Sequence, residues 1–262
     1  MKKILISTIV LQCLGYVALS NGRAGADTVK VDPANVKTSF LKEGTNRYLV
    51  YFKKGKDSSR VSYQMWTRQI AFSEYAGKKA ITVTQEWEDN AAVVHKVTSV
   101  SDRQTFAPLF HDTWWKGRGS ASFDFTKKAA SLNNTPLTDA DTLKGKKQMF
   151  DAFQVALKEN YILNWHLDLE VFPILPYQAN RTFLINFYDP GFGVPKYQEY
   201  TVTGSDVLET YENQKVDCWL LTHTTPGGKE VFWISKKTRE VLKLEQEFRG
   251  SYRYKIKLGF SV

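Results

Sequence analysis

The sequence predicts a mainly β (α+β) protein, in which a strongly curved antiparallel sheet or half-barrel surrounds one substantial central helix. Aromatic residues make up 14% of the 262 residues, and such a high content favours strands. From residue 47 onward, apolar and polar residues alternate in many short runs, which is the period of a half-buried strand. Turn-forming residues separate these runs, so we expect hairpins rather than long crossovers.

Residues 1–26 have the pattern of a secretory signal peptide that is cleaved. Two lysines precede an apolar stretch, residues 4–19, and Ala24-Gly25-Ala26 is a small-residue cleavage site. The stretch is shorter than the ~20 residues of a membrane-spanning helix. Gln12, which precedes its cysteine, does not suit lipoprotein processing. We expect a periplasmic or secreted protein, residues 27–262, with no transmembrane anchor after processing.

In the N-terminal half, five runs have the composition and period of strands. They are residues 47–53, 59–72, 79–88, 92–101 and 120–127. Short turns at residues 55–58, 75–77 and 88–90 separate the first four, because glycine, asparagine and aspartate favour turn conformations.

The middle of the chain predicts the one substantial helix, around residues 147–163. Its apolar residues recur every three or four positions, as one face of a helix requires. They are Phe150, Phe153, Leu157 and Tyr161. The next run, residues 163–172, fits either a strand or a helix, and Pro173 and Pro176 end it. Residues 188–193 read as a loop.

The C-terminal part predicts a meander of four antiparallel strands. Turns at residues 225–228, 236–239 and 250–251 join strand-like runs that are too close together for crossover connections. In the last run two sets of side chains alternate between the faces. Tyr252, Tyr254, Ile256, Leu258 and Phe260 share one face, and Arg253, Lys255 and Lys257 share the other.

Charge and cysteine content narrow the class of protein. Without residues 1–26, 33 basic and 27 acidic residues leave a net charge of +6, with basic pairs such as Lys78-Lys79 mostly near turns. Such pairs fit solvated turns, or else an anionic membrane surface or polysaccharide. No cluster of this kind predicts nucleic-acid binding. One cysteine remains, Cys218, and we expect a buried structural thiol. No repeat or linker divides the chain, so a single β-rich domain is expected.

Few residues in this sequence form a pattern typical of catalysis. His166, Asp168 and Glu170 would share one face of a strand, where they could bind a metal or hydrolyse a substrate. Two pairs of carboxylates two residues apart, Asp168/Glu170 and Glu245/Glu247, would lie about 7 Å apart, near the spacing in glycosidases. None has a supporting motif, so we assign no catalytic residue, no metal site and no cofactor.

The aromatic residues supply the candidate ligand-binding site. Most aromatic side chains in strands pack in a core or pair across a sheet. A curved sheet can also leave an apolar concavity that holds an acyl chain or a similar ligand, or its aromatic faces can stack on sugar rings. The residues that we assign to such a concavity are Trp66, Trp87, Trp114, Trp115, Phe123 and Tyr188.

Several segments of the C-terminal half resemble a known family. They are Phe150-Asp151, residues 200–206, residues 216–221, residues 232–238 and residues 241–244. Together they resemble an uncharacterised family of exported bacterial proteins, typical of Bacteroidetes, that carries a domain of unknown function. The resemblance implies a distant relation to the lipoprotein-carrier (LolA/LolB-like) superfamily and a curved sheet wrapped around a helix. It also implies that Trp219 and Trp233 face one another across a hairpin.

These observations lead to one expected function and two alternatives. We expect a non-enzymatic cell-envelope protein that binds an apolar small molecule such as a lipid or acyl chain in its concave sheet. One alternative is a structural or assembly module that binds an envelope protein partner through an exposed sheet edge. The other is an envelope hydrolase that uses Asp168, Glu170 or His166.

Overall fold

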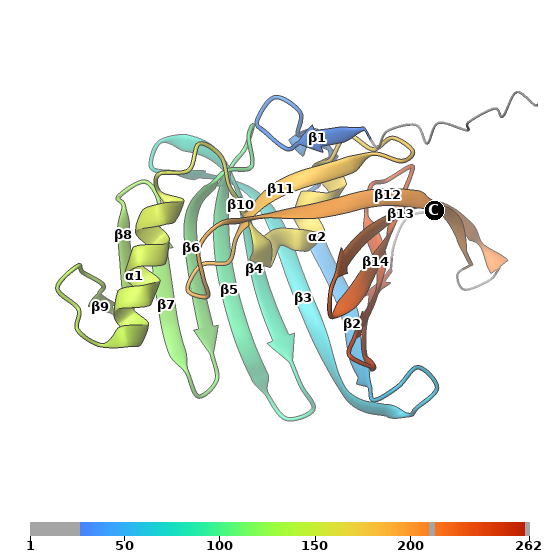
Figure 1. Cartoon of the computed structure of the whole chain (residues 1–262), viewed down its shortest axis with the longest axis horizontal. Helices are drawn as coiled ribbons and strands as arrows, with labels where there is room; N and C mark the ends of the chain where they lie inside the picture. The colour runs from blue at the N-terminus through green and yellow to red at the C-terminus, as the bar shows by residue number, and fades with distance from the viewer. Residues whose placement is uncertain (1–26, 210–212, 260–262) are drawn as a thin grey trace, which may run out of the picture.

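The computed structural model describes residues 27–209 and 213–259, so the predicted signal peptide lies outside the described residues. Within these residues, sixteen strands form one curved sheet that does not close (Figure 1). This confirms the predicted fold class.

The strands follow one another in an almost unbroken meander. The first half contains β1 (Thr28–Lys30), β2 (Gly44–Lys53), β3 (Arg60–Tyr75), β4 (Lys78–Glu88), β5 (Val93–Asp102), β6 (Pro108–Trp115), β7 (Gly119–Asp124), β8 (Ala129–Leu132) and β9 (Thr135–Pro136). The second half contains β10 (Leu163–Asn164), β11 (Thr182–Tyr188), β12 (Lys196–Glu209), β13 (Lys215–Thr225), β14 (Gly228–Ser235), β15 (Val241–Phe248) and β16 (Ser251–Leu258).

Strand β16 joins the two halves of the sheet. It pairs antiparallel with β15 before it and with β2 from the beginning of the chain, where Tyr254 lies opposite Tyr51. The sheet therefore runs β1-β11-β12-β13-β14-β15-β16-β2-β3-β4-β5-β6-β7-β8-β9. Among the strands that the structure describes, only β1 and β10 pair parallel, both with β11. The edges of the sheet are two very short strands, β1 and β9.

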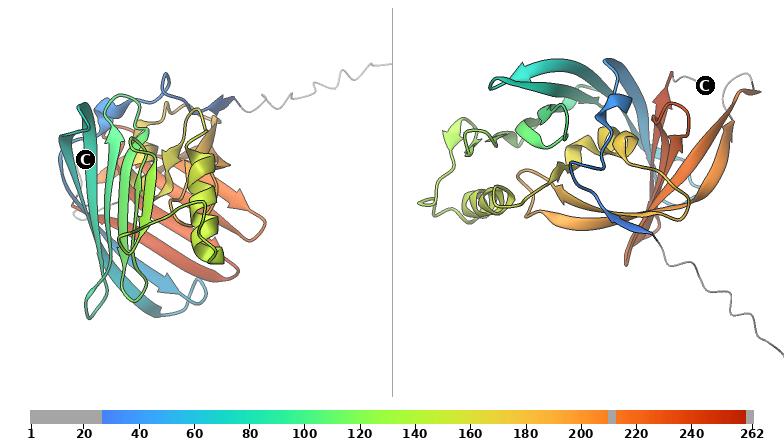
Figure 2. Two further views of the ribbon diagram at one scale, coloured as in Figure 1. Left: turned by 90° about the vertical axis from the view of Figure 1, so that its left-hand side faces the viewer. Right: turned by 90° about the horizontal axis from the view of Figure 1, so that it is seen from above.

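The predicted helix forms, but it does not occupy the centre of the curved sheet. Helix α1 (Lys144–Ala156) begins three residues earlier than expected and ends five residues before Tyr161. It lies at one end of the sheet (Figure 2). Its buried Phe153 packs there against Phe123 of β7.

A run of short helical turns fills the concavity instead. It consists of η2 (Trp165–Leu167), α2 (Asp168–Val171) and η3 (Phe172–Ile174), and we call it the helical plug. The curved sheet has two arms, one made of β2–β9 and the other of β11–β16. Seen from above, the plug lies between these two arms (Figure 2). The side chain of Asn164 accepts a hydrogen bond from the backbone N–H of His166, which caps the first turn and decides between the two structures that the sequence left open.

The main core lies between the plug and the concave face. Leu167, Phe172 and Ile174 of the plug are fully buried against residues of both arms, including Val83 and Phe232. Truncation of a buried phenylalanine such as Phe172 would cost about 3–5 kcal/mol. Much of the apolar interior is therefore packed with side chains.

One sequence-based expectation for the C-terminal meander is wrong. Trp219 lies opposite Ile234, whereas Trp233 lies opposite Leu220, so the two tryptophans are on opposite faces of the sheet. A bulge between β14 and β15 has a similar effect, because it places Leu242 on the convex side and Leu244 in the main core. Register and bulges depend on pairing, which alternation within one strand does not reveal.

Candidate functional site

Three of the six predicted aromatic residues form a row across the concave face. Backbone register aligns Trp66 of β3 with Trp87 of β4, then with His95 of β5 and Trp115 of β6. The rings of Trp66 and Trp87 stack with centroids 3.7 Å apart, and those of His95 and Trp115 stack at 3.6 Å. The row is mostly packed, since Trp66 is only 3% exposed.

The other three predicted residues lie elsewhere. Trp114 points to the convex side, because neighbouring residues of a strand alternate between faces. Phe123 and Tyr188 are fully buried in the small core beneath α1. The six aromatic residues therefore do not line one common cavity.

The carboxylates of the helical plug form buried ion pairs with the sheet. Glu170 accepts hydrogen bonds from Arg68 of β3, one of them from Nε at 2.9 Å, and Asp168 accepts one from Lys255 of β16 at 2.8 Å. The residues of the plug form helical turns. His166, Asp168 and Glu170 therefore do not share the face of a strand, as they would if this segment were extended.

Burial and ion pairing oppose each other at Asp168. Burial alone raises the pKa of the Asp168 carboxyl, but the charges of Lys255 and Arg68 outweigh it and the net pKa is lowered. Its charge is balanced within the fold, as that of Glu170 is by Arg68. These two carboxylates therefore hold the plug in place rather than face a substrate.

Three buried histidines lie between the plug and β5–β6. The ring of His166 lies 4.8 Å from that of His111 and 5.6 Å from that of His95, measured between centroids. On its open side, Nε2 of His166 lies 3.1 Å from Oδ1 of Asp189. The imidazole of His166 therefore lies between two other histidines and a carboxylate.

Hydrogen bonds fix one nitrogen of two of these rings. Nδ1 of His95 lies 2.9 Å from the carbonyl oxygen of Trp114, to which it donates. Nδ1 of His111 accepts from Asn164 Nδ2 at 2.9 Å, and the hydroxyl of Ser99 lies at the same distance. The Nε2 atoms of both rings are buried without a hydrogen-bond partner among the described residues.

Burial keeps the rings of His95 and His111 neutral. Burial and the neighbouring His166 lower the pKa of His95 to about 4, and burial lowers the pKa of His111 well below its ordinary value. Across residues 27–209 and 213–259, no three His, Cys, Asp or Glu side chains are arranged to hold a metal ion.

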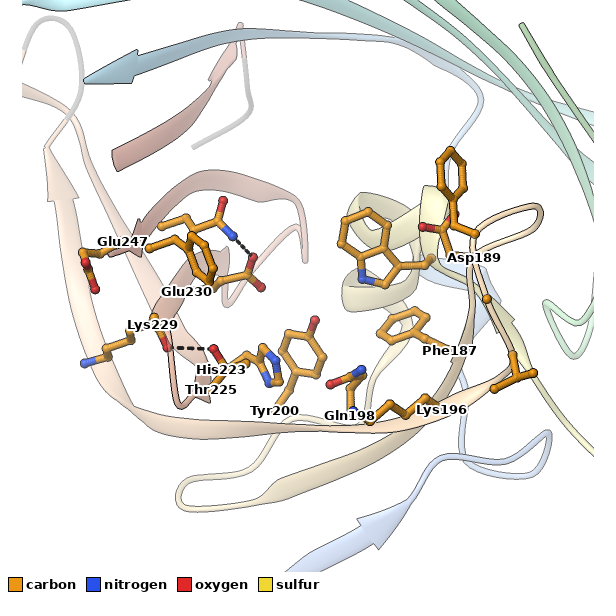
Figure 3. Close-up of a pocket in the computed structure, with 17 residues that line it drawn as sticks. Phe187, Asp189, Lys196, Gln198, Tyr200, His223, Thr225, Lys229, Glu230 and Glu247 are labelled. Carbon is orange, nitrogen blue, oxygen red and sulfur yellow. Dashed lines mark hydrogen bonds between the residues drawn. The ribbon is translucent and has the colours of Figure 1, made fainter. Parts of the chain in front are cut away.

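A cavity of about 480 Å³ opens beside Asp189, on the inner side of β11–β15. Figure 3 shows Tyr200, His223 and Glu230, from three different strands, around one space, with Phe187 and Asp189 across it. We call it the β11–β15 cavity. Its size lies within the range of about 300–1,000 Å³ that is typical of small-molecule sites.

The floor of the β11–β15 cavity is polar and ordered. Glu230 accepts a hydrogen bond from Gln246 Nε2 at 2.6 Å, and Arg253 lies 3.8 Å away. Burial raises the pKa of Glu230 despite this arginine. The ring of His223 stacks on that of Tyr200 at 4.7 Å. These groups offer both acceptors and donors to the polar part of a ligand.

The rim of the β11–β15 cavity is apolar and exposed to solvent. Phe192 and Val194, in the loop between β11 and β12, are each 57% exposed, and Phe248 at the end of β15 is 49% exposed. Exposed large apolar side chains that gather around a cavity mark a binding surface more often than isolated ones do. The cavity therefore combines an apolar rim with a polar floor.

Sequence reasoning missed most residues of this cavity. Of its neighbourhood, only the loop at residues 188–193 was identified, from its proline and glycines. Glu230, His223 and Phe248 come from strands and turns that looked like ordinary members of the meander. A charged residue such as Glu230 in an alternating strand reads as solvent-exposed, and only the curvature of the sheet turns it inward.

Among the described residues, no helix has the length and apolar character needed to cross a membrane. Comparison with curated proteins gives no significant match. A family model described as "Protein of unknown function (DUF3108)" matches residues 47–257, which confirms that the chain carries a domain of unknown function. The chain therefore belongs to the DUF3108 family.

Proposed function

We propose that this protein binds an amphipathic ligand, a lipid or another acyl-chain compound, in the β11–β15 cavity. One observation carries the proposal, namely that Phe192, Val194 and Phe248 line a cavity with a polar floor while each remains at least 49% exposed. An acyl chain that covers these side chains would gain about 0.8 kcal/mol for each buried methylene. The polar head would then meet Glu230, Gln246 and His223.

The position of the ligand differs from the one expected from the sequence. The helical plug fills the deep part of the concavity, and Trp66 and Trp87 stack on each other instead of lining a hollow. A ligand is therefore proposed at the open side of the sheet, next to the plug. The leader-like residues 1–26 support an envelope location, where lipids are abundant, as part of the same proposal.

The two alternative functions have less support. Docking through a sheet edge needs an accessible strand, but the edge strands β1 and β9 contain three and two residues, and β9 ends in a proline. A hydrolase that uses Asp168 or Glu170 would need free carboxylates, and both are engaged in ion pairs. Ligand binding without chemistry therefore remains the proposal.

Native mass spectrometry of residues 27–262, purified from their native envelope and followed by lipid extraction, tests the proposal. We expect a bound mass of lipid size, and uptake of added palmitate by stripped protein. The double variant Phe192→Ser/Phe248→Ser should weaken palmitate binding about tenfold or more, since each 1.4 kcal/mol of lost apolar contact is a factor of ten.

The matched control replaces two exposed apolar residues that lie outside the cavity, Val61 and Val207. The variant Val61→Ser/Val207→Ser should bind palmitate like the unchanged protein. A bare protein mass with no uptake of palmitate, or an equal loss in both double variants, would contradict the proposal.

A further inference from the structure

A second cavity, of about 710 Å³, shares no residue with the first. It is bounded by η1 (Thr38–Phe40) and the residues after it, by the beginning of β4, and by the turn that follows β5. Its base is the edge of the main core, with Leu41 and Ile81 only 4% and 1% exposed. We call it the η1 cavity.

Four cationic side chains line the η1 cavity. Lys42, Lys78 and Lys79 are exposed, and Arg103 is partly buried. None of the four makes an ion pair within the described residues. This differs from the buried cations Arg68, Lys255 and Lys257, each of which has a carboxylate partner.

The carboxylates near these cations form no ion pair with them within the described residues, although the charge of Lys78 contributes to the lowered pKa of Asp102. Asp102 lines the cavity, but its Oδ1 accepts the backbone N–H groups of Gln104 and Thr105, both at 2.9 Å. Glu43 accepts the backbone N–H of Phe72 at 2.7 Å. Glu74 lies opposite Lys79 in the β3–β4 pairing without forming an ion pair. Four cations and one lining carboxylate leave the cavity with an excess of three positive charges.

Arg103 is held in place although it has no anionic partner. Its guanidinium lies 3.7 Å from the ring centroid of Phe72, and its backbone N–H donates to the carbonyl of Lys79. A guanidinium that stacks on an aromatic ring keeps its N–H edges available for an oxyanion, and less freedom is lost when one binds. The hydroxyls of Thr38 and Ser39 line the same cavity and add hydrogen-bond donors.

We propose that the η1 cavity binds a phosphate group. Several cations converge on it from separate elements, one of them oriented by stacking, and a phosphate can accept charge-assisted hydrogen bonds from all of them. The phosphate can belong to a lipid head group or to a soluble phosphorylated compound. This site goes beyond the proposed function, because it neither shares residues with the β11–β15 cavity nor requires an acyl chain.

Two probes separate these sources. Inorganic pyrophosphate is titrated calorimetrically into residues 27–262 at low salt, and sedimentation measures binding to vesicles of phosphatidylglycerol, with phosphatidylcholine vesicles for comparison. Binding of both anionic probes, or of either one alone, supports the site, and which one binds identifies the source. Affinity should fall as salt is added, since the lysines are exposed.

The variant Lys79→Gln/Arg103→Gln should weaken binding of the anionic probe about tenfold or more, because hydrogen bonds to charged groups contribute about 1.5–3 kcal/mol. The control variant Lys54→Gln/Lys56→Gln removes the same charge from exposed residues of the β2–β3 hairpin and should change affinity less than twofold. The rim variant Phe192→Ser/Phe248→Ser should bind the anionic probe normally, so failure at one cavity is distinguishable from failure at the other. Absence of binding to both anionic probes, or an equal loss in the two charge variants, would overturn the inference.

Discussion

Two groups of cations in this protein differ in whether the fold supplies their counter-ions. Arg68, Lys255 and Lys257 point into the concavity and are 1%, 3% and 4% exposed, and each has a carboxylate partner. The cations of the η1 cavity, such as Lys79 and Arg103, reach solvent and have no ion-pair partner within the described residues.

The difference follows from the cost of burying a charge. An unpaired buried ion loses its hydration without compensation, so a stable fold must pair it. An exposed lysine keeps its hydration and needs no partner. The buried pairs therefore belong to the structure of the sheet and plug, whereas the cations of the η1 cavity, which form no ion pair within the described residues, are those that we propose to bind an external anion.

The largest effect is expected where one member of a buried pair is removed. Glu170→Gln leaves the guanidinium of Arg68 buried without its counter-charge, and should lower the free energy of unfolding by about 3–5 kcal/mol. Urea denaturation at pH 7 measures this change. The double variant Arg68→Met/Glu170→Leu removes both charges and should recover most of the loss. A single variant that costs less than about 1 kcal/mol would show that the pair is not buried in solution.

A smaller loss of stability is expected when the buried neutral histidines are protonated at low pH. These groups are buried like Arg68 but have no counter-ion. The folded pKa of His95, about 4, lies below the unfolded value near 6.5, so the unfolded state binds more protons between these values. His111, whose pKa is also lowered, acts in the same direction. The contribution of these two neutral histidines to stability is therefore fully present above about pH 6.5 and is lost as the pH falls toward 4.

Urea denaturation at pH 7 and pH 4.5 checks this second prediction. The unchanged protein should lose more stability than His111→Gln does over this interval, because the variant has one fewer group to protonate. Equal pH dependence in both proteins would contradict the assignment, since acidic residues titrate alike in the two.

The smallest effect is expected at the η1 cavity. Lys78→Gln and Lys79→Gln remove exposed charges without ion pairs, so each should change the free energy of unfolding by no more than about 0.5 kcal/mol. Urea denaturation of each variant beside Glu170→Gln places both groups of charges on one scale. A loss above about 1 kcal/mol would show that these lysines are structural, and the comparison between the two groups would fail.

Local patterns in the sequence predicted much of the fold. The alternating runs at residues 47–53 and 79–88 became β2 and β4, and the glycine turns at residues 225–228 and 250–251 became hairpins. Periods of two and turn chemistry are properties of a few adjacent residues, so they can be read without knowledge of the rest of the chain. The segment of β6 was not assigned, because its alternation is broken by Trp114-Trp115.

The candidate site depended on contacts between distant parts of the chain. The pattern predicted that Trp66, Trp87 and Trp115 lie in or near the concavity, but the close stacking of Trp66 on Trp87 depends on strand register. The β11–β15 cavity forms because the curvature of the sheet brings Asp189 and Glu230 to the same space. The spacing of these residues along the chain does not predict that they line one cavity.

The last strand shows how the two kinds of information divide. The sequence by itself determined that Tyr254 and Lys255 lie on opposite faces, because side chains alternate along any strand. Only the tertiary structure decided that the face with Arg253, Lys255 and Lys257 turns inward, while Tyr254 stacks on Tyr51 on the convex side. A buried lysine is stable only where a carboxylate balances its charge. For Lys255 that partner is Asp168 of the plug, which lies 87 residues earlier in the chain.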